Sequence, residues 1–530
     1  MKINGKKVVT PDVTKRPNST MHRALLCFLF HSAARAVHSS SSAAQPALLR
    51  IASASIRAGD GFVAVRFREA AAVALAKTSE EEEELELFPP LYLRDNDVGA
   101  FHPSTLQRLR PAALLAPDEG AAQLRVLDGG AALWVQWASD GANSTFAAGW
   151  LRDHSLRAER RAERRAALGF LDELVPWVRA DFPRGGGDGG GGGGGGDGFA
   201  PPPALCHSYD AVLADDRAAL AWLDVLWSRG VSVLRGGPAG RAGAVQAIAE
   251  RLGTALRATN YGGTFEVQDK PQPNNQAYTT AALPLHTDLP FYTRPPGVQM
   301  LHCVSPSADG VGGRSLLVDG LAVSAALAVE SPELHEVLLR TPVAFADDNP
   351  DRYYLRAEHT ILEQSGGGGG GGGGSGGGGV VVGVNYNEGV RDSSLDTLPP
   401  VEVPQFYAAL AAFGRAAHDP ANLLELRLAA GDVLVFHNRR VLHGRSAFKA
   451  AGGASSGGRG GGGASNNSSG GGASASAAED APPPPSSRHL QGGYIEWDDV
   501  FSFRRVLRRR LARCRGRNDD DQLCTADAGH

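Results

Sequence analysis

Leu285-His286-Thr287-Asp288-Leu289-Pro290 is the stretch that decides how this chain is interpreted. In an extended strand, side chains two residues apart point to the same face, so His286 and Asp288 can reach one ion together. His-x-Asp occurs once among the 15 histidines, and no His-x-Glu competes with it. Chance alone could supply one such triplet, in a surface loop for example, so its interpretation depends on the rest of the chain.

A third ligand is found far along the chain, in Asn438-Arg-Arg-Val-Leu-His443-Gly-Arg445. Two imidazoles and one carboxylate leave positions open on a ferrous ion for a co-substrate and O₂, as in non-haem iron oxygenases. Gly444 would allow another backbone to approach closely beside the ligand. We therefore predict that His286, Asp288 and His443 bind Fe(II).

Such an oxygenase needs an electron-donating co-substrate, and a dicarboxylate such as 2-oxoglutarate needs a cation for its far carboxylate. Arg488 is the candidate, because a guanidinium matches a carboxylate with two parallel hydrogen bonds. The low-complexity stretch 450–487 separates it from His443, and removing most of that stretch brings the two close in sequence. The alternative is a surface arginine beside a loop.

Composition sets limits on the class of protein. A chain of 530 residues can hold two domains, and a formal net charge of −4 gives no reason to propose a nucleic-acid partner. No apolar run approaches the roughly 18 residues of a membrane span. The five cysteines are scattered without a CxxC pair, which argues against a disulfide framework and favours a reducing compartment.

Residues 1–59 are expected to be a disordered transit peptide. No acidic residue lies between Lys15 and Gly59, and the stretch carries arginines and a serine run, which is typical of organelle targeting. The mitochondrion is the expected destination, with the plastid or the cytoplasm left open. Met21 is an alternative start, and a disordered basic tail is the alternative interpretation.

The remaining sequence divides into two expected domains. Residues 60–182 form a small N-terminal domain, with a strand at 132–137 and an Arg-rich helix at 151–168, and a Gly/Pro-rich linker follows at 183–203. Residues 204–517 form the catalytic domain, in which the Gly-rich stretches 366–379 and 450–487 are surface insertions. Residues 518–530 are a disordered tail.

The catalytic domain alternates helical and β-rich runs. Helical spacing occurs at 211–229, where Gly230 is the expected C-terminal stop, and again at 242–252. The short strand-like runs are 231–235, 298–304, 315–319, 380–385, 433–437 and 494–496. An α+β fold follows, with a small β-barrel or jelly roll that carries the separated metal ligands.

Aromatic residues gather in sequence around the metal-binding motifs. They are Tyr261, Phe265, Tyr278, Phe291, Tyr292, Tyr494 and Trp497. Aromatic faces can enclose a quaternary ammonium group by cation–π attraction. Ordinary core packing explains any single one of them equally well.

Several long motifs resemble the gamma-butyrobetaine dioxygenase and trimethyllysine dioxygenase family of taurine-dioxygenase-like oxygenases. They are Tyr261-Gly-Gly-Thr-Phe-Glu-Val-Gln-Asp-Lys270, Asn274-Asn-Gln-Ala-Tyr-Thr-Thr280, His286-Thr-Asp-Leu-Pro290, Pro295-Pro-Gly-Val-Gln-Met-Leu-His-Cys303, Arg440-Val-Leu-His-Gly-Arg445 and Arg488-His-Leu-Gln-Gly-Gly-Tyr494. The resemblance spans most of Tyr209–Arg510, and the Leu-Pro after His-Thr-Asp looks more like the butyrobetaine enzymes.

The resemblance implies a double-stranded β-helix core with flanking helices, and Fe(II), 2-oxoglutarate and O₂ as reactants, with ascorbate as a further cofactor to consider. It places iron on His286, Asp288 and His443. It places 2-oxoglutarate on Arg488, Ser315 and Asn275. The trimethylammonium cage falls on Tyr261, Phe265, Tyr278 and Tyr494, and the substrate carboxylate on Asn387.

Two departures from the family pattern stand out. Phe265 occupies a position where the family usually has Trp, the better cation–π face. In the N-terminal domain the family holds zinc with three cysteines and a histidine, but here the corresponding residues are Asp97-Val-Gly-Ala100 and Ala142. These side chains offer neither thiolate nor imidazole, so we expect no zinc there.

The resemblance implies hydroxylation of a small trimethylammonium carboxylic acid, with gamma-butyrobetaine giving carnitine as the leading case. Trimethyllysine hydroxylation is the nearest alternative. A catalytically silent jelly roll that serves as a binding or scaffold protein is the alternative from another class. The family suggests a homodimer, and the basic stretch Arg504–Arg517 is expected to be a solvated or dimer-packing helix rather than a nucleic-acid surface.

Overall fold

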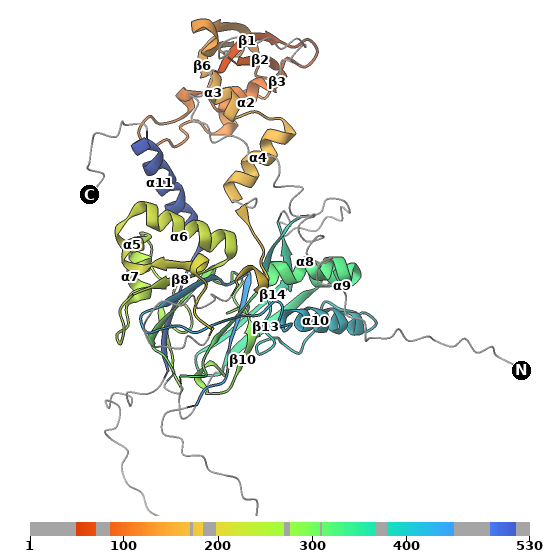
Figure 1. Ribbon diagram of the computed structural model, residues 1–530. Helices are drawn as coiled ribbons and strands as arrows, with labels where there is room; N and C mark the ends of the chain where they lie inside the picture. The colour runs from red at the N-terminus through yellow and green to blue at the C-terminus, as the bar shows by residue number, and fades with distance from the viewer. Residues whose placement is uncertain are drawn as a thin grey trace, which may run out of the picture. The chain divides into compact units, whose positions relative to one another are not determined.

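The computed structural model describes residues 49–69, 85–169, 173–183, 198–269, 276–307, 310–365, 379–449 and 488–515. Most of the expected transit peptide, most of the insertion 366–379, all of the insertion 450–487, the tail 518–530 and Asn275 lie outside these residues. The chain divides into two compact units, Met1–Asp172 and Glu173–His530, and Figure 1 traces both by residue number.

The first unit is built from two three-stranded antiparallel sheets. The strands of one sheet are β1 (Leu49–Ile56), β2 (Val63–Glu69) and β3 (Leu85–Phe88), and those of the other are β4 (Ala121–Leu127), β5 (Ala132–Trp137) and β6 (Asn143–Ala147). Both sheets contribute to one core, in which Val65 and Phe88 from the first meet Val135 and Trp137 from the second. This unit is therefore β-rich.

Two expectations for this unit differ from the structure. Strand β1 begins at Leu49, inside the segment 1–59 that we assigned to the transit peptide, because its alternating side chains bury Ile51 in the core. The expected helix 151–168 is two helices, α3 (Ala148–Asp153) and α4 (Ala158–Gly169). They are separated at Ser155, whose hydroxyl donates a hydrogen bond to buried Glu86 instead of continuing the helix.

The second unit contains two larger sheets. One has six strands in the order β7-β8-β18-β11-β20-β9, and the other has four in the order β10-β19-β12-β17. The strands of the six-stranded sheet are β7 (Cys206–Ser208), β8 (Val231–Arg235), β9 (Thr264–Val267), β11 (Val298–Ser305), β18 (Val433–His437) and β20 (His489–Ile495). Those of the four-stranded sheet are β10 (Leu283–His286), β12 (Ser315–Asp319), β17 (Leu424–Leu426) and β19 (Val441–Arg445).

The two large sheets face each other across a shared core. Leu301 and Phe436 of the six-stranded sheet pack in one cluster with Leu317 and Leu426 of the four-stranded sheet. All pairings in these sheets are antiparallel except that of β7 with β8. The arrangement is consistent with the jelly roll expected from the sequence.

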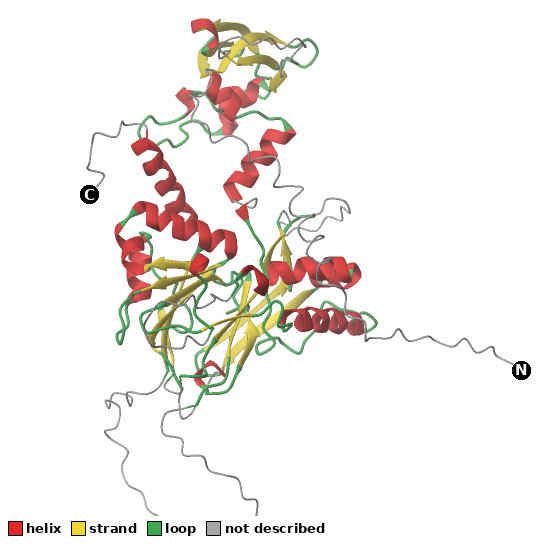
Figure 2. Ribbon diagram, in the orientation of Figure 1, coloured by secondary structure: helices red, strands yellow, loops and turns green. Residues whose placement is uncertain are grey.

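Helices cover the outer face of the six-stranded sheet (Figures 1 and 2). They are α5 (Tyr209–Ala214), α6 (Asp216–Arg229), α7 (Ala244–Arg251) and α11 (Trp497–Arg515). The expected helix 211–229 is divided, because the Asp215 carboxylate accepts a hydrogen bond from the Ala218 amide and thus caps a new helix, α6. Gly230 ends α6 in the left-handed conformation, as expected.

A second group of helices and two hairpins form another large hydrophobic core of this unit, together with residues of both large sheets. The helices are α8 (Gly320–Glu330), α9 (Pro332–Arg340) and α10 (Val403–Ala417). The hairpin strands are β13 (Pro342–Asn349) with β14 (Tyr353–Thr360), and β15 (Leu362–Gln364) with β16 (Val381–Val384). Tyr494 of β20 and Leu285 of β10 belong to the same core cluster, which therefore reaches the metal-binding motif.

One face of the basic C-terminal helix α11 packs against its own unit, while residues such as Arg509 and Arg510 are exposed. Arg504 is 1% exposed and forms ion pairs with Glu173 and Asp224 of the same unit. Leu507 is fully buried in the core beneath the helix. Residues 173–182 also belong to this unit rather than to the N-terminal domain, since Trp177 lies in the core between the sheets.

No helix in the described ranges has both the length and the apolar character needed to cross a membrane.

Candidate active site

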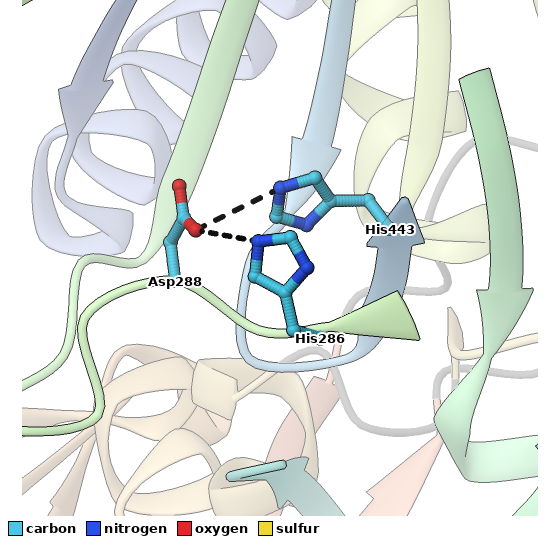
Figure 3. Close-up of side chains that lie close together, drawn as sticks. All are labelled: His286, Asp288 and His443. Atoms are coloured by element: carbon cyan, nitrogen blue, oxygen red, sulfur yellow. Dashed lines mark ion pairs between the residues drawn. The ribbon is translucent and has the colours of Figure 1, made fainter. Parts of the chain in front are cut away.

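His286, Asp288 and His443 meet at the edge of the four-stranded sheet (Figure 3). Nε2 of His286 lies 3.1 Å from Oδ1 of Asp288, and Nε2 of His443 lies 3.7 Å from the same oxygen. One ligand atom from each residue lies within 4.8 Å of the other two. Within the described residues this is the one group of three or more such side chains close enough to share a metal ion.

Strand pairing explains why residues so distant in sequence come together. His286 is the last residue of β10 and stands directly opposite His443 in the antiparallel pair β10–β19. His443 lies in the middle of its own strand, not just after the strand 433–437 as the sequence suggested. A Cβ on Gly444 would lie 2.7 Å from the carbonyl oxygen of Leu283, so glycine permits the close approach we expected.

The spacing suits a first-row metal ion. Ligands about 2.1 Å from such an ion place adjacent donor atoms about 3 Å apart. The Asp288–His286 distance meets this value, and the Asp288–His443 distance is only slightly longer. Small rotations of the side chains would bring all three donors onto one ion, with the remaining positions open.

The charges of Asp288 and His443 support the same interpretation, whereas at His286 burial, which lowers the pKa, is outweighed by the hydrogen bond to Asp288 and its charge, which raise it. Burial acts to raise the pKa of the Asp288 carboxyl, but His443, His286 and a hydrogen bond from Tyr494 together hold this pKa below its ordinary value. Burial, helped by the nearby His286, lowers the pKa of His443 to about 3. At neutral pH the site therefore offers an ionised carboxylate and a neutral imidazole, which are the forms that bind metals.

Two hydrogen-bonded partners hold Asp288, and the sequence had given neither this role. The Tyr494 hydroxyl donates to Oδ2 of Asp288 at 2.7 Å. The side chain of Asn438, which is fully buried, accepts from the Asp288 amide at 2.7 Å and donates to the Asp288 carbonyl at 2.9 Å. Leu289, the next residue, has a φ of 59°, so this clamp holds the chain where it turns sharply away.

Arg488, the expected co-substrate residue, is a buried cation that pairs with no acidic side chain of the described residues. Its side chain is 6% exposed, and no Asp or Glu of the described residues pairs with it. Burial and the neighbouring Arg445 lower its pKa to about 10, which leaves the guanidinium charged at neutral pH. A buried unpaired guanidinium favours an anionic ligand.

The other expected co-substrate residues are placed less fully. Ser315 is buried at the start of β12, opposite Arg445 in the neighbouring strand β19. Asn275 lies outside the described residues. A cavity of about 350 Å³ reaches Arg488 and Cys303, but no member of the metal triad lines it, so it does not connect the arginine with the metal position.

Three of the four expected cage residues form a continuous aromatic wall. The ring centroids of Tyr261 and Phe265 are 6.3 Å apart, and those of Phe265 and Tyr494 are 5.2 Å apart with the rings stacked. The fourth, Tyr278, is buried and lies close to Tyr494. The pKa of Tyr494 is raised by burial first, then by Asp288, and to a smaller extent by Tyr261 and Tyr278. Through the Tyr494–Asp288 hydrogen bond, this wall adjoins the metal triad.

Asn387, the expected contact of the substrate carboxylate, lies beside the metal-binding motif. Its side-chain amide donates to the carbonyl of Thr287 at 3.2 Å and accepts from the amide of Gly389 at 3.0 Å. One amide hydrogen therefore remains for a ligand.

A cluster of ion pairs occupies the N-terminal region where the family pattern has zinc ligands. Arg94 is 8% exposed and pairs with Asp97 at 3.3 Å, Asp140 at 2.6 Å and Glu119 at 3.7 Å. Asp97 also accepts a hydrogen bond from Ser144 at 2.9 Å. The Arg94 guanidinium thus provides a positive charge between the carboxylates of Asp97 and Asp140, near the positions where the family pattern has zinc ligands.

Comparison with known proteins indicates which family the chain belongs to. Residues 201–457 match the family described as taurine catabolism dioxygenase TauD, TfdA family. The chain is 30% identical to a gamma-butyrobetaine dioxygenase of Pongo abelii over 432 residues, 81% of this chain and 93% of the relative. It is 29% identical to one from Pseudomonas sp. (strain AK-1), over 80% of this chain and 91% of the relative.

The mitochondrial trimethyllysine dioxygenase of Gallus gallus matches a shorter part of the chain, with 30% identity over 38% of this chain and 46% of the relative. The butyrobetaine relatives therefore match along both units, whereas this relative matches less than half of the chain. The protein is a dioxygenase, and it belongs to the gamma-butyrobetaine dioxygenase family.

Proposed function

We propose that this protein is an Fe(II)- and 2-oxoglutarate-dependent hydroxylase of a small trimethylammonium carboxylic acid, with gamma-butyrobetaine converted to carnitine. The observation that carries the proposal is the aromatic wall of Tyr261, Phe265 and Tyr494, which a hydrogen bond joins to Asp288. A cation held on this wall would lie beside the metal position.

The roles of the residues follow from their chemistry. His286, Asp288 and His443 would hold iron, and Arg488 would bind the far carboxylate of 2-oxoglutarate. Bound iron and 2-oxoglutarate would supply the oxidising power, with one oxygen atom of O₂ entering the substrate C–H bond as 2-oxoglutarate becomes succinate and CO₂. Asn387 would bind the substrate carboxylate and so fix which carbon faces the metal, by holding both ends of the molecule.

Asp288→Ala provides the direct test of the metal assignment. We expect it to abolish Fe(II)-dependent release of succinate from 2-oxoglutarate in the presence of gamma-butyrobetaine. Asp348→Ala, at an exposed carboxylate in β13, is the control and should keep wild-type turnover. Normal turnover by Asp288→Ala would contradict the assignment.

Trimethyllysine is the second candidate substrate, because a relative named for it matches part of the chain. A substrate panel with coupled succinate release separates the two, since only the productive substrate stimulates succinate formation above the background. We expect kcat/KM to be higher for gamma-butyrobetaine. A higher value for trimethyllysine would reassign the substrate while leaving the reaction class unchanged.

We further propose that the N-terminal segment directs the protein to mitochondria. Strand β1 begins at Leu49, so a cleavable segment would end before that residue. Fluorescence microscopy of residues 1–48 fused to a reporter tests this, and a diffuse cytoplasmic signal would contradict it.

A further inference from the structure

Asp347 of β13 contacts one end of the aromatic wall, at the hydroxyl of Tyr261. Its Oδ2 atom accepts hydrogen bonds from the Tyr261 hydroxyl at 3.4 Å, the Tyr353 hydroxyl at 3.4 Å and the Asn260 side-chain amide at 3.2 Å. The Tyr292 hydroxyl in turn donates to Oδ1 of Asn260 at 3.1 Å, which orients the Asn260 amide toward Asp347. The carboxylate is therefore held in place by neutral donors alone.

No cation balances this carboxylate within the described residues. No Lys, Arg or His among them forms an ion pair with Asp347, and its second oxygen, Oδ1, accepts no hydrogen bond from them. The residue is only partly exposed. Its negative charge is therefore not offset by a cation of the described residues and can attract a positively charged ligand.

The Tyr261 ring connects Asp347 to the candidate cage. Its hydroxyl contacts Asp347, while the centroid of its ring lies 6.3 Å from the centroid of the Phe265 ring. Burial raises the pKa of Tyr261, and Asp347, Tyr353 and Asp288 raise it further, so Tyr261 remains a neutral donor. A hydroxyl that donates to a carboxylate makes its ring richer in electrons, which strengthens attraction of a cation to the ring face.

A quaternary ammonium group is the cation that such an arrangement suits. It has no N–H and therefore cannot use a carboxylate as a hydrogen-bond partner. What it gains is the electrostatic attraction itself, which acts over several ångströms in a weakly polar environment. A carboxylate that contacts the wall through the Tyr261 hydroxyl supplies this attraction without filling the space for the methyl groups.

We propose that Asp347 is a specificity-determining residue, which selects a cationic substrate over a neutral one of the same shape. It does so by placing a negative charge at the hydroxyl end of Tyr261 in the aromatic wall. This inference rests on the proposed function, because it takes the wall of Tyr261, Phe265 and Tyr494 to be the trimethylammonium site.

The test compares two ligands that differ only in charge. They are gamma-butyrobetaine and its carbon isostere 5,5-dimethylhexanoate, in which a tert-butyl group replaces trimethylammonium. The dissociation constant of each is measured by calorimetry on the full-length protein, loaded with Fe(II) and 2-oxoglutarate without oxygen. The variants are Asp347→Asn, which keeps the shape, Asp347→Glu, which keeps the charge, and Asp348→Asn, the exposed neighbour on the same strand.

We expect the wild-type preference for the cationic ligand to fall roughly tenfold in Asp347→Asn, with binding of the isostere unchanged. Asp347→Glu and Asp348→Asn should keep most of the preference. The inference is overturned if Asp347→Asn keeps the preference, if it weakens both ligands equally, or if Asp347→Glu loses the preference to the same extent. The last two results would indicate a purely structural residue.

The wild-type measurement distinguishes this inference from the proposed function. If the wild-type protein does not prefer the cationic ligand, the proposed function fails and the inference fails with it. If the wild-type protein prefers the cation and Asp347→Asn does so equally, the inference alone fails.

Discussion

The hydroxyl of Tyr494 donates a 2.7 Å hydrogen bond to the Oδ2 atom of Asp288, so one aromatic residue contacts both the candidate cage and the candidate metal centre. The bond leaves Oδ1 of Asp288 to face His286 and His443. The carboxylate is thereby oriented to give one oxygen to a metal ion and to keep the other engaged.

Tyr494→Phe is therefore expected to weaken Fe(II) binding about tenfold, because partners that orient a metal ligand contribute this much to affinity. The ring that faces Phe265 remains, so the dissociation constant for the trimethylammonium ligand should change much less. Anaerobic titration with Fe(II) measures the first quantity and calorimetry the second. Tyr261→Phe is the control, since its hydroxyl bonds to Asp347 rather than to Asp288. Unchanged iron affinity in Tyr494→Phe would refute the role.

Arg488→Lys should raise the KM for 2-oxoglutarate at least about tenfold while the protein stays folded. Lysine keeps the positive charge but loses the two parallel hydrogen bonds of the guanidinium. Arg235→Lys is the matched control, because Arg235 lines the same cavity and already pairs with Asp432 at 2.8 Å. Equal KM changes in the two variants would argue against Arg488 as the co-substrate residue.

The position of Phe265 depends on a glycine across the sheet. A Cβ added to Gly492 would lie 2.2 Å from Cζ of Phe265, so the ring lies directly over the glycine. Gly492→Ala should displace the ring, weaken binding of the trimethylammonium ligand several-fold and lower the free energy of unfolding by about 1–3 kcal/mol.

Gly493→Ala is the control for this prediction, because the nearest atom to its Cβ would be the end of the Leu256 side chain, at 3.2 Å, and the Gly263 carbonyl oxygen would be at an ordinary contact distance of 3.5 Å. In the double variant Gly492→Ala/Phe265→Ala the stability loss attributable to the clash should disappear. Urea unfolding gives the free energies, and additive effects of the two substitutions would show that the predicted contact does not exist.

How much of this could be read from the sequence depends on the residue. The clustering of His286, Asp288 and His443 could be predicted because they occur in recognisable motifs. Strand periodicity predicted strands such as 132–137 and 231–235 as they are observed. The pairing of His286 with His443 is a property of sheet register, which a single sequence does not specify.

Residues that act through contacts distant in sequence were missed. Asn438 lies in a quoted motif, but its clamp on Asp288 depends on the geometry of the turn before β19. Asp347 lies in a hairpin without any motif, and only the fold brings it to Tyr261. By contrast, the division of helix 211–229 at Asp215 had a visible signal, because aspartate is a strong N-cap residue.

A buried histidine outside the metal triad predicts how stability varies with pH. Burial, helped by Arg440, lowers the pKa of His437 to about 3, whereas the unfolded chain has an ordinary histidine. Below pH 6.5 the unfolded state therefore takes up a proton that the folded state does not. Stability should fall as pH decreases, by up to about 1.4 kcal/mol per pH unit from this group.

His437→Gln should flatten this pH dependence between about pH 6 and pH 4, because the group that titrates only in the unfolded state is gone. The slope of the unfolding free energy against pH is measured by urea denaturation. His418→Gln, at an exposed histidine of the surface, should leave the slope as it is in the wild type. The same steep slope in His437→Gln would contradict the prediction.

The N-terminal unit should be held by ion pairs and packing rather than by zinc. Arg94 is buried and pairs with Asp97, Asp140 and Glu119, so replacing it by Met leaves the buried Glu119 without its cation and Asp97 with only its pair to Arg110 at 3.6 Å. That change should destabilise this unit by about 3 kcal/mol, seen as faster hydrogen exchange of the β5 amides. Arg108→Met removes a half-exposed pair with Asp95 and should cost less than about 1 kcal/mol.

A chelator should leave the exchange rates of β5 unchanged in the wild type. Stoichiometric zinc, or faster exchange after chelation, would show that the metal had been retained by other ligands.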